Sequence, residues 1–166
     1  MKEFTTTYIG LGTNLGNRPS NLHTSRLFLE ASVGTLKAQS SIYETKAWGI
    51  EGQPDFLNQV VALTTSLRPQ QVLDTILAIE EAMGRVRERK WYTRLIDIDL
   101  LLYGSEIIKE ADLMVPHPYI QDRNFVLAPL AEIAGKTIHP ILKKSIKELE
   151  EACLDPLEVW RYFNDE

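Results

Sequence analysis

The segment that most constrains the fold is residues 94–104, RLIDIDLLLYG, in which apolar side chains recur at every second position. This period of two is typical of a β-strand with one buried face. The side chains expected on that face are Ile96, Ile98, Leu100 and Leu102. Asp97 and Asp99 then share the opposite face, roughly 7 Å apart. The strand therefore carries two neighbouring like charges, which are costly beside apolar groups unless something compensates them.

Strand and helix patterns alternate along the rest of the chain. Strands are expected over about 6–12, 35–44 and 57–65, in addition to the strand at 94–104. Helices are expected from a cap at Ser20 or Asn21 to about Val33, from Pro69 to Gly84, from near Val126, and from Ser145. The order β-α-β-β-α-β predicts an α+β fold, a ferredoxin-like βαββαβ sandwich with helices over one face of a mainly antiparallel sheet and extra C-terminal elements. No linker interrupts the pattern, so we expect one domain over residues 1–166.

Composition excludes several classes of protein. No run of 18 apolar residues and no repeat occurs, so membrane-spanning and solenoid architectures are disfavoured. The first residues, MKEFTTTYIG, do not resemble an export signal, and the one cysteine, Cys153, cannot form an intrachain disulfide. A cytoplasmic location is therefore expected. The formal net charge of −5 argues against a general nucleic-acid-binding surface.

A short basic segment lies directly before the strand with the two aspartates. Its cations are Arg85, Arg87, Arg89, Lys90 and Arg94. Mg²⁺ is typically held by one or two carboxylates together with substrate phosphates, and guanidinium groups clamp phosphate oxygens. Each feature alone more often marks a solvated surface, but together they indicate phosphoryl transfer.

An ordered series of motifs resembles the 6-hydroxymethyl-7,8-dihydropterin pyrophosphokinases of folate biosynthesis. The resemblance includes YIGLGTNLGNR, SSIYETKAWG, QPDFLNQVVAL, GRVRERKWYTRLIDIDLLLYG and VPHPYIQDRNFVLAPL, and so extends over nearly the whole chain. It implies an α+β fold and an ATP-dependent pyrophosphokinase (diphosphotransferase) that moves the pyrophosphoryl group of ATP to the pterin hydroxymethyl and releases AMP.

The resemblance also implies roles for individual residues. Asp97 and Asp99 match the pair that holds two Mg²⁺ ions. Catalytic positions are expected at Arg85, Lys90, Arg94, Asp97 and Asp99. ATP contacts are expected at Glu80, Arg87, Trp91, Ile98, His117 and Arg123. Pterin contacts are expected at Gly12, Thr45, Trp48, Phe56, Asn58 and Phe125. For the pterin, aromatic faces and an amide at the ring edge are the groups that a flat heterocycle requires.

Two other classes of function remain open at this point. A different metal-dependent enzyme, such as a nucleotidyl- or glycosyltransferase, can use the same pair of aspartates, and a ferredoxin-like sensor can bind a metabolite without turnover. The partners expected are ATP and 6-hydroxymethyl-7,8-dihydropterin, with neither nucleic acid nor membrane, and the chain is expected to be a monomer.

Overall fold

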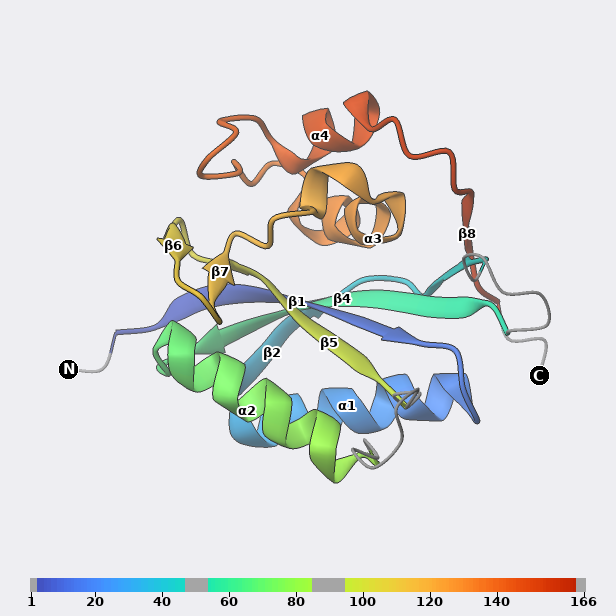
Figure 1. Cartoon of the computed structure of the whole chain (residues 1–166), viewed down its shortest axis with the longest axis horizontal. Coiled ribbons are helices and arrows are strands. Elements are labelled where there is room, and N and C mark those ends of the chain that lie inside the picture. The colour runs from blue at the N-terminus through green and yellow to red at the C-terminus, as the bar shows by residue number, and fades with distance from the viewer. Residues whose placement is uncertain (1–2, 47–53, 85–94, 164–166) are drawn as a thin grey trace.

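The computed structural model describes residues 3–46, 54–84 and 95–163 as a sheet with helices on both faces (Figure 1). In chain order the elements are β1 (Thr5–Thr13), α1 (Arg18–Ser32), β2 (Gly34–Gln39), β3 (Tyr43–Thr45), β4 (Phe56–Thr65), α2 (Pro69–Ala82), β5 (Asp97–Tyr103), β6 (Ile108–Lys109), β7 (Met114–Val115), a 3-10 turn (Ile120–Asp122), α3 (Asn124–Ala134), α4 (Ile146–Ala152) and β8 (Val159–Arg161).

The described strands form one six-stranded sheet and a separate β6–β7 hairpin. The order in the sheet is β5-β1-β4-β3-β8, and β2 pairs with the part of β4 that β3 leaves free. Every pairing in the sheet is antiparallel. The prediction of a mixed α and β protein with a mainly antiparallel sheet is therefore confirmed.

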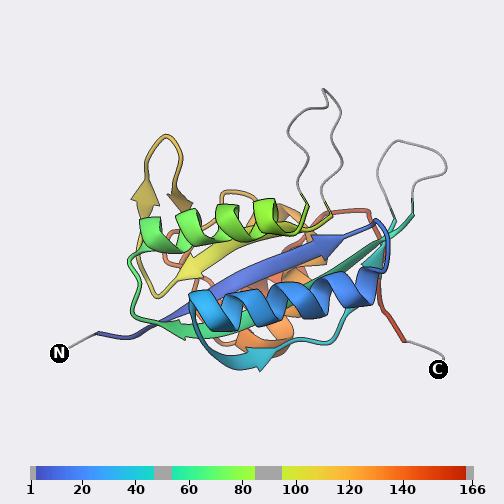
Figure 2. The ribbon, with the colours of Figure 1, turned by 90° about the horizontal axis from the view of Figure 1, so that it is seen from below.

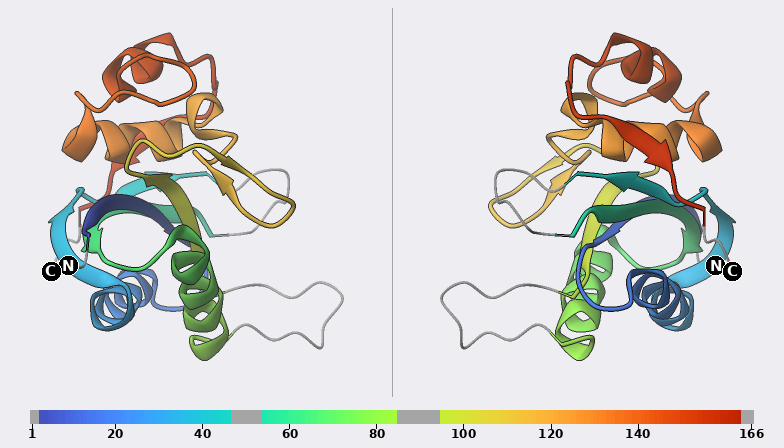
Figure 3. Two further views of the ribbon diagram at one scale, coloured as in Figure 1. Left: turned by 90° about the vertical axis from the view of Figure 1, so that its left-hand side faces the viewer. Right: turned by 90° about the vertical axis from the view of Figure 1, so that its right-hand side faces the viewer.

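Helices cover both faces of the sheet (Figure 1). Helices α1 and α2 lie side by side on one face, which Figure 2 presents toward the viewer. Helices α3 and α4 lie on the other face, and the side views of Figure 3 show these three layers edge-on. The expected C-terminal elements, α3 and α4, were not assigned to a face by the sequence; both carry buried apolar residues, which pack on the face of the sheet that α1 and α2 leave open.

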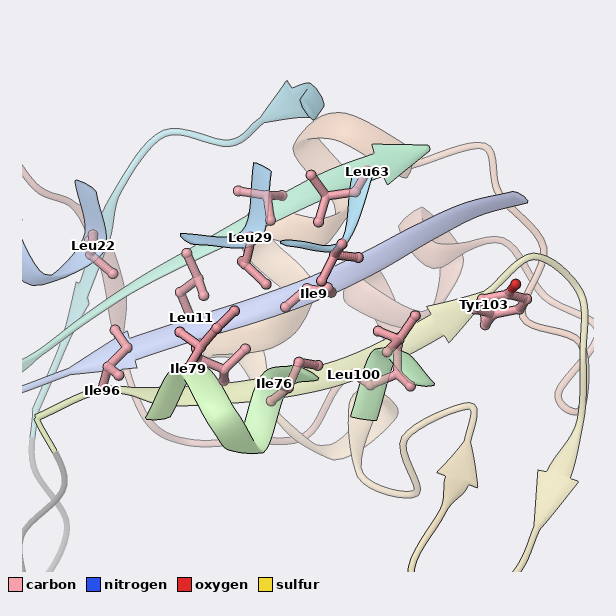
Figure 4. Close-up of a cluster of buried hydrophobic side chains, with 14 of the residues drawn as sticks. Ile9, Leu11, Leu22, Leu29, Leu63, Ile76, Ile79, Ile96, Leu100 and Tyr103 are labelled. Atoms are coloured by element: carbon pink, nitrogen blue, oxygen red, sulfur yellow. The ribbon is translucent and has the colours of Figure 1, made fainter. Parts of the chain in front are cut away.

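The larger core lies between the sheet and the helices α1 and α2. Figure 4 shows it as a continuous cluster of aliphatic side chains from both layers. Leu22 and Leu29 of α1 and Ile76 of α2 are at most 1% exposed. Ile98 and Leu100 of β5 belong to the same cluster, as the alternation in the sequence predicted.

The alternation breaks within β5, so Leu102 does not lie on the face predicted for it. In the register with β1, Leu100 pairs with Ile9 and Leu102 with Tyr8, which leaves Leu101 as the extra residue of a β-bulge. Leu101 and Leu102 both pack in the second core, under α3 and α4. The bulge therefore moves Leu102 to the opposite face of the sheet.

Two predicted boundaries also differ from the structure. Helix α1 is capped by Asn17, whose side chain accepts a hydrogen bond from the Ser20 amide at 3.1 Å, and not by Ser20 or Asn21. The strand predicted at 35–44 is split into β2 and β3. Between them, the Ser40 hydroxyl accepts from the Val60 amide at 3.0 Å and so takes the place of a backbone partner. No helix in the described part of the chain has both the length and the apolar character needed to cross a membrane.

Candidate active site

A row of cross-strand neighbours places the predicted site residues on the sheet face below α3. Asp97 of β5 pairs with Gly12 of β1, Gly12 pairs with Asn58 of β4, and Asn58 pairs with Tyr43 of β3. Two residues further along β5, Asp99 pairs with Gly10 of β1. Because directly paired residues project to the same face of a sheet, Asp97 and Asn58 stand on one surface with a glycine between them.

Gly10 and Gly12 keep the centre of this surface open. A Cβ added to Gly12 would lie 3.3 Å from the Asn58 Oδ1, and one added to Gly10 would lie 3.4 Å from a methyl carbon of Leu101. Side chains at these two positions would therefore occupy the space between the aspartates on β5 and the amide on β4.

A cavity of about 350 Å³ stands above these glycines. Its volume lies in the range of small-molecule sites. It brings together eight residues that the sequence analysis proposed for the site: Gly12, Thr45, Phe56, Asn58, Asp97, Asp99, Arg123 and Phe125. Residues that are distant in the sequence, from β1 to α3, therefore meet in one cavity.

The two aspartates fit a magnesium site that substrate oxygens complete. Asp97 is partly buried, and Asp99 is exposed. Both carboxylates line the cavity, where their oxygens are the hard donors that Mg²⁺ prefers. Among the described residues, no group of three or more histidine, cysteine or acidic side chains is placed to hold a metal ion by itself. The donor set therefore suits a cation that is shared with phosphate and water rather than one enclosed by protein.

Glu80 fixes the strand that carries this pair. Its side chain is 4% exposed on α2, and its Oε2 accepts a hydrogen bond from the Ile98 amide at 3.0 Å. This bond anchors the backbone between Asp97 and Asp99. The Ile98 side chain lies in the core below the sheet, so only its backbone is available to a ligand in the cavity.

Asn58 presents an unpaired donor to the cavity. The residue is 5% exposed, and its Nδ2 has no hydrogen-bond partner. A buried amide without a partner is costly, by about 1–3 kcal/mol. Because Asn58 lines the cavity, a ligand acceptor in the cavity can satisfy this group.

The guanidinium of Arg123 is held between two aromatic rings. Its Cζ lies 5.0 Å from the centroid of Tyr119 and 5.6 Å from that of Phe125. These are distances at which cation–π attraction operates. The arrangement places a fixed positive charge in the cavity wall next to the aromatic side chain of Phe125.

His117 lies beside this group as a neutral ring. Burial lowers its pKa, Arg123 lowers it further, and Asp99 opposes both effects. The Tyr119 amide donates to the His117 Nδ1 at 3.2 Å, so the proton of the neutral ring is on Nε2. His117 therefore offers an N–H donor close to Asp99, although it does not line the cavity itself.

The Thr45 hydroxyl has a structural partner as well as a place in the cavity. It donates to the Glu158 carbonyl oxygen at 3.0 Å, so a ligand can meet it only as an acceptor. The remaining proposed site residues, Trp48, Arg85, Arg87, Lys90, Trp91 and Arg94, lie outside the described residues.

Comparison with known proteins agrees with this geometry. The family model described as 7,8-dihydro-6-hydroxymethylpterin-pyrophosphokinase (HPPK) matches residues 8–135. The chain belongs to the HPPK family. Among curated HPPK relatives, the 2-amino-4-hydroxy-6-hydroxymethyldihydropteridine pyrophosphokinase of Aquifex aeolicus is 45% identical over 152 residues, which cover 91% of this chain and 94% of the relative. The protein of the same name from Haemophilus influenzae is 39% identical over 150 residues, or 88% of this chain and 94% of the relative.

Solved structures show the same fold at much lower identity. The wild-type HPPK-DHPS of Plasmodium falciparum superposes with a TM-score of 0.74 at 18% identity, over 91% of this chain and 45% of that one. This chain thus spans less than half the length of that HPPK-DHPS chain.

Several residues of the HPPK cavity were not found from the sequence. Leu101 and Val126 form apolar wall, and Leu157 reaches the cavity from the segment before β8. Leu101 is set by the bulge and Leu157 by the pairing of a three-residue strand, and neither has a local sequence signal. Gly10 could have been found, because it lies two residues before Gly12 in a strand and therefore shares its face.

Proposed function

We propose that this protein transfers the pyrophosphoryl group of ATP to 6-hydroxymethyl-7,8-dihydropterin, giving AMP and the pterin diphosphate for folate synthesis. The observation that carries the proposal is the combination of groups in the cavity: two carboxylates at one end, an unpaired buried amide at the other, and the Arg123 guanidinium beside Phe125. Membership of the HPPK family supports the same reaction.

The two ends of the cavity suit the two substrates. Asp97 and Asp99 would hold two Mg²⁺ ions, which supply charge neutralisation for the triphosphate when they are bound. Arg123 would contact phosphate oxygens, and the Nε2–H of His117 would donate to the nucleotide. The Asn58 amide would pair with an edge of the pterin between the apolar surfaces of Phe56 and Phe125.

The chemical step needs alignment more than a strong base. The pterin hydroxymethyl oxygen forms a bond to the β-phosphorus, and the bond between that phosphorus and the oxygen bridging to the α-phosphate breaks. AMP leaves, and the hydroxyl proton passes to solvent. Residues of this chain contribute by holding the two substrates in line and by placing cations around the charge that develops.

We further propose that β1, α1, β2 with β3, β4, α2 and β5 form a ferredoxin-like βαββαβ unit, in which β2 and β3 together represent its second strand. In this proposal residues 1–166 form a single pyrophosphokinase domain that works as a monomer in the cytoplasm. The sheet order β5-β1-β4-β3 supports the ferredoxin-like unit, because in this order the last strand of the unit lies beside its first strand.

The test is to mix the protein with ATP, Mg²⁺ and 6-hydroxymethyl-7,8-dihydropterin and to follow the products by chromatography. AMP and a diphosphorylated pterin are expected in equal amounts, with no AMP when the pterin is omitted. Formation of ADP and a monophosphorylated pterin would contradict the proposal.

Substitution of the aspartates tests the metal-binding role. Asp97→Ala and Asp99→Ala are each expected to remain folded and to lower kcat by about a thousandfold, because the charge of the triphosphate is then poorly neutralised. Circular dichroism controls for folding. Turnover near that of the wild type in both variants would refute the assignment of the metal to this pair.

A further inference from the structure

The segment between α4 and β8 supplies one wall of the cavity. It descends from α4 to the sheet, as the right-hand view of Figure 3 shows in red. Leu157 from this segment lines the cavity together with Thr45, Phe56 and Phe125. The segment lies beyond residue 135, where the match to the HPPK family model ends.

One anchor of this wall is at the start of α3. The Asn124 amide donates to the Asp155 Oδ2 at 3.1 Å, and the Asn124 side chain donates to the Asp155 carbonyl oxygen at 3.1 Å. The other carboxylate oxygen, Oδ1, accepts from the Leu157 amide at 2.9 Å. Asp155 therefore ties the backbone of Leu157 to the residue that precedes Phe125.

A second anchor is at the end of β3. The Thr45 hydroxyl donates to the Glu158 carbonyl oxygen at 3.0 Å, and Thr45 pairs with Val159 in the sheet. The Trp160 Nε1 donates to the Glu44 Oε1 at 3.1 Å. Leu157 thus lies between two anchors. One joins Asp155 to Asn124, the neighbour of Phe125, and the other joins Glu158 to Thr45.

The sheet order places Leu157 at the end of the cavity away from the aspartates. Asp97 and Asp99 are on β5, and Leu157 directly precedes the strand β8 at the other end of the order β5-β1-β4-β3-β8. Neighbouring strands are about 4.8 Å apart, so several strand widths separate the two ends. The nucleotide end and the end lined by Leu157 are therefore distinct.

We propose that Leu157 is a specificity-determining residue of the pterin end, where its side chain packs against the bound heterocycle, and that Asp155 is the positioning residue that holds it there. This proposal rests on the proposed function. It assigns a substrate contact to a segment that the family match does not include, and it assigns none of the nucleotide contacts to that segment.

The test compares Leu157→Ala with Leu154→Ala. Leu154 is 94% exposed in the same segment, so its loss controls for a general effect of removing a leucine there. Leu157→Ala is expected to raise the KM for the pterin about tenfold, because apolar contact with the ring is lost, and to leave the KM for ATP within about twofold. Leu154→Ala is expected to match the wild type in both constants.

Two further measurements separate a substrate contact from a structural role. Leu157→Met keeps a similar volume and is expected to restore most of the pterin affinity. Binding of a non-hydrolysable ATP analogue with Mg²⁺, measured by calorimetry, is expected to be unchanged in Leu157→Ala, which also reports that the nucleotide end is folded.

The outcomes distinguish this proposal from the function on which it rests. If the wild type forms no pterin diphosphate, the proposed function itself is wrong. If the wild type is active and Leu157→Ala keeps the wild-type KM for the pterin, or loses ATP-analogue binding equally, the role given to Leu157 is overturned while the proposed function stands.

Discussion

At the scale of single residues, the site depends on an absence of side chains as much as on their presence. Gly12 lies in register between Asp97 and Asn58 and leaves the surface between them clear. Any other residue at this position would bring its Cβ to 3.3 Å from the Asn58 Oδ1. Between Asp97 and the Asn58 amide the sheet therefore presents only the backbone of Gly12, and a flat ligand can lie on it.

Gly12→Ala tests this role. The added methyl group is expected to lower kcat/KM about tenfold, because it displaces either the Asn58 side chain or the ligand. The melting temperature is expected to stay the same or rise slightly, because alanine loses less conformational freedom than glycine on folding. Enzyme assays and thermal melts measure the two effects.

The matched control for this substitution is Thr6→Ala, at an exposed position of the same strand, β1. It is expected to leave kcat/KM unchanged. If Gly12→Ala lowered both kcat/KM and the melting temperature, the loss of activity would be due to unfolding, and the proposed role of Gly12 in keeping the surface open would be wrong.

The pair of aspartates could be predicted from the residues alone, because two neighbouring carboxylates are unusual in an apolar strand. The other site residues, such as Asn58 and Phe125, could be predicted only through the family resemblance, because an amide or an aromatic ring at such a position is common in any fold. Leu157 and Leu101 could not be predicted in this way, because a leucine is an ordinary core residue in any element. Their place in the cavity depends on long-range pairing and on a bulge.

At the scale of elements, Glu132 ties α3 to the sheet. Its carboxylate accepts from the Tyr43 hydroxyl at 2.6 Å and from the Ser41 amide at 2.9 Å, and it lies 3.7 Å from the guanidinium of Arg161 on β8. Burial acts to raise the pKa of Glu132, but the hydrogen bonds from Tyr43 and Ser41 and the charge of Arg161 outweigh it, so the pKa is lowered. The charged form is therefore favoured in the folded protein.

Glu132→Gln is expected to lower the free energy of unfolding at pH 7 by about 1 kcal/mol, because charge-assisted hydrogen bonds are lost. The wild type has this contribution at pH values above 4.5, the ordinary pKa of the group, and loses it as the pH falls through the lower pKa of the folded state. The difference between wild type and variant is thus expected to shrink below pH 4.5. Urea denaturation at several pH values measures it.

The control for Glu132→Gln is Glu151→Gln, which removes a 3.9 Å ion pair with Lys147 between side chains that are 65% and 67% exposed. Exposed pairs of this kind contribute little. A loss of stability with Glu151→Gln as large as that with Glu132→Gln would show that the contacts of Glu132 have no special effect.

The long elements could be predicted, and the short ones could not. Helix α2 runs from Pro69 and ends before Gly84, whose φ of +107° suits glycine, and α4 follows the Ser145–Glu148 capping box. These signals are local, so the sequence contains them. Strands β6, β7 and β8 have two or three residues each, and their formation depends on partners elsewhere in the chain. The β2–β3 break likewise depends on a serine that bonds across to β4.

At the scale of the whole molecule, one sheet serves two cores. Neighbouring residues of β4 contribute to different cores. Val61 packs in the core with α1 and α2, and Val60 packs in the core with α3 and α4. In β5, Leu100 and Leu101 divide in the same way. Because the strands are common to both cores, loss of either core is expected to destabilise the other. The cavity lies on the α3 side, and its position therefore depends on both.

Leu130→Ala tests this coupling from the smaller core. Leu130 is fully buried on α3, so its truncation is expected to cost about 2–5 kcal/mol of unfolding free energy. Unfolding is expected to remain a single transition, with the same midpoint by tryptophan fluorescence and by far-ultraviolet circular dichroism. Ile107→Ala, at a 51% exposed position, is the control and is expected to change little. Two separate transitions in Leu130→Ala would mean that the cores unfold independently.

The hydrogen bond from the Ile98 amide to Glu80 has a consequence beyond the chemistry of the site. β5 is the edge strand next to β1 in the described sheet. Backbone donors along the free edge of such a strand can pair with strands of other molecules. Glu80 occupies one of those donors with a carboxylate from the same chain. The side chain that steadies the aspartates therefore also removes one of the donors that an edge strand could offer to a strand of another molecule.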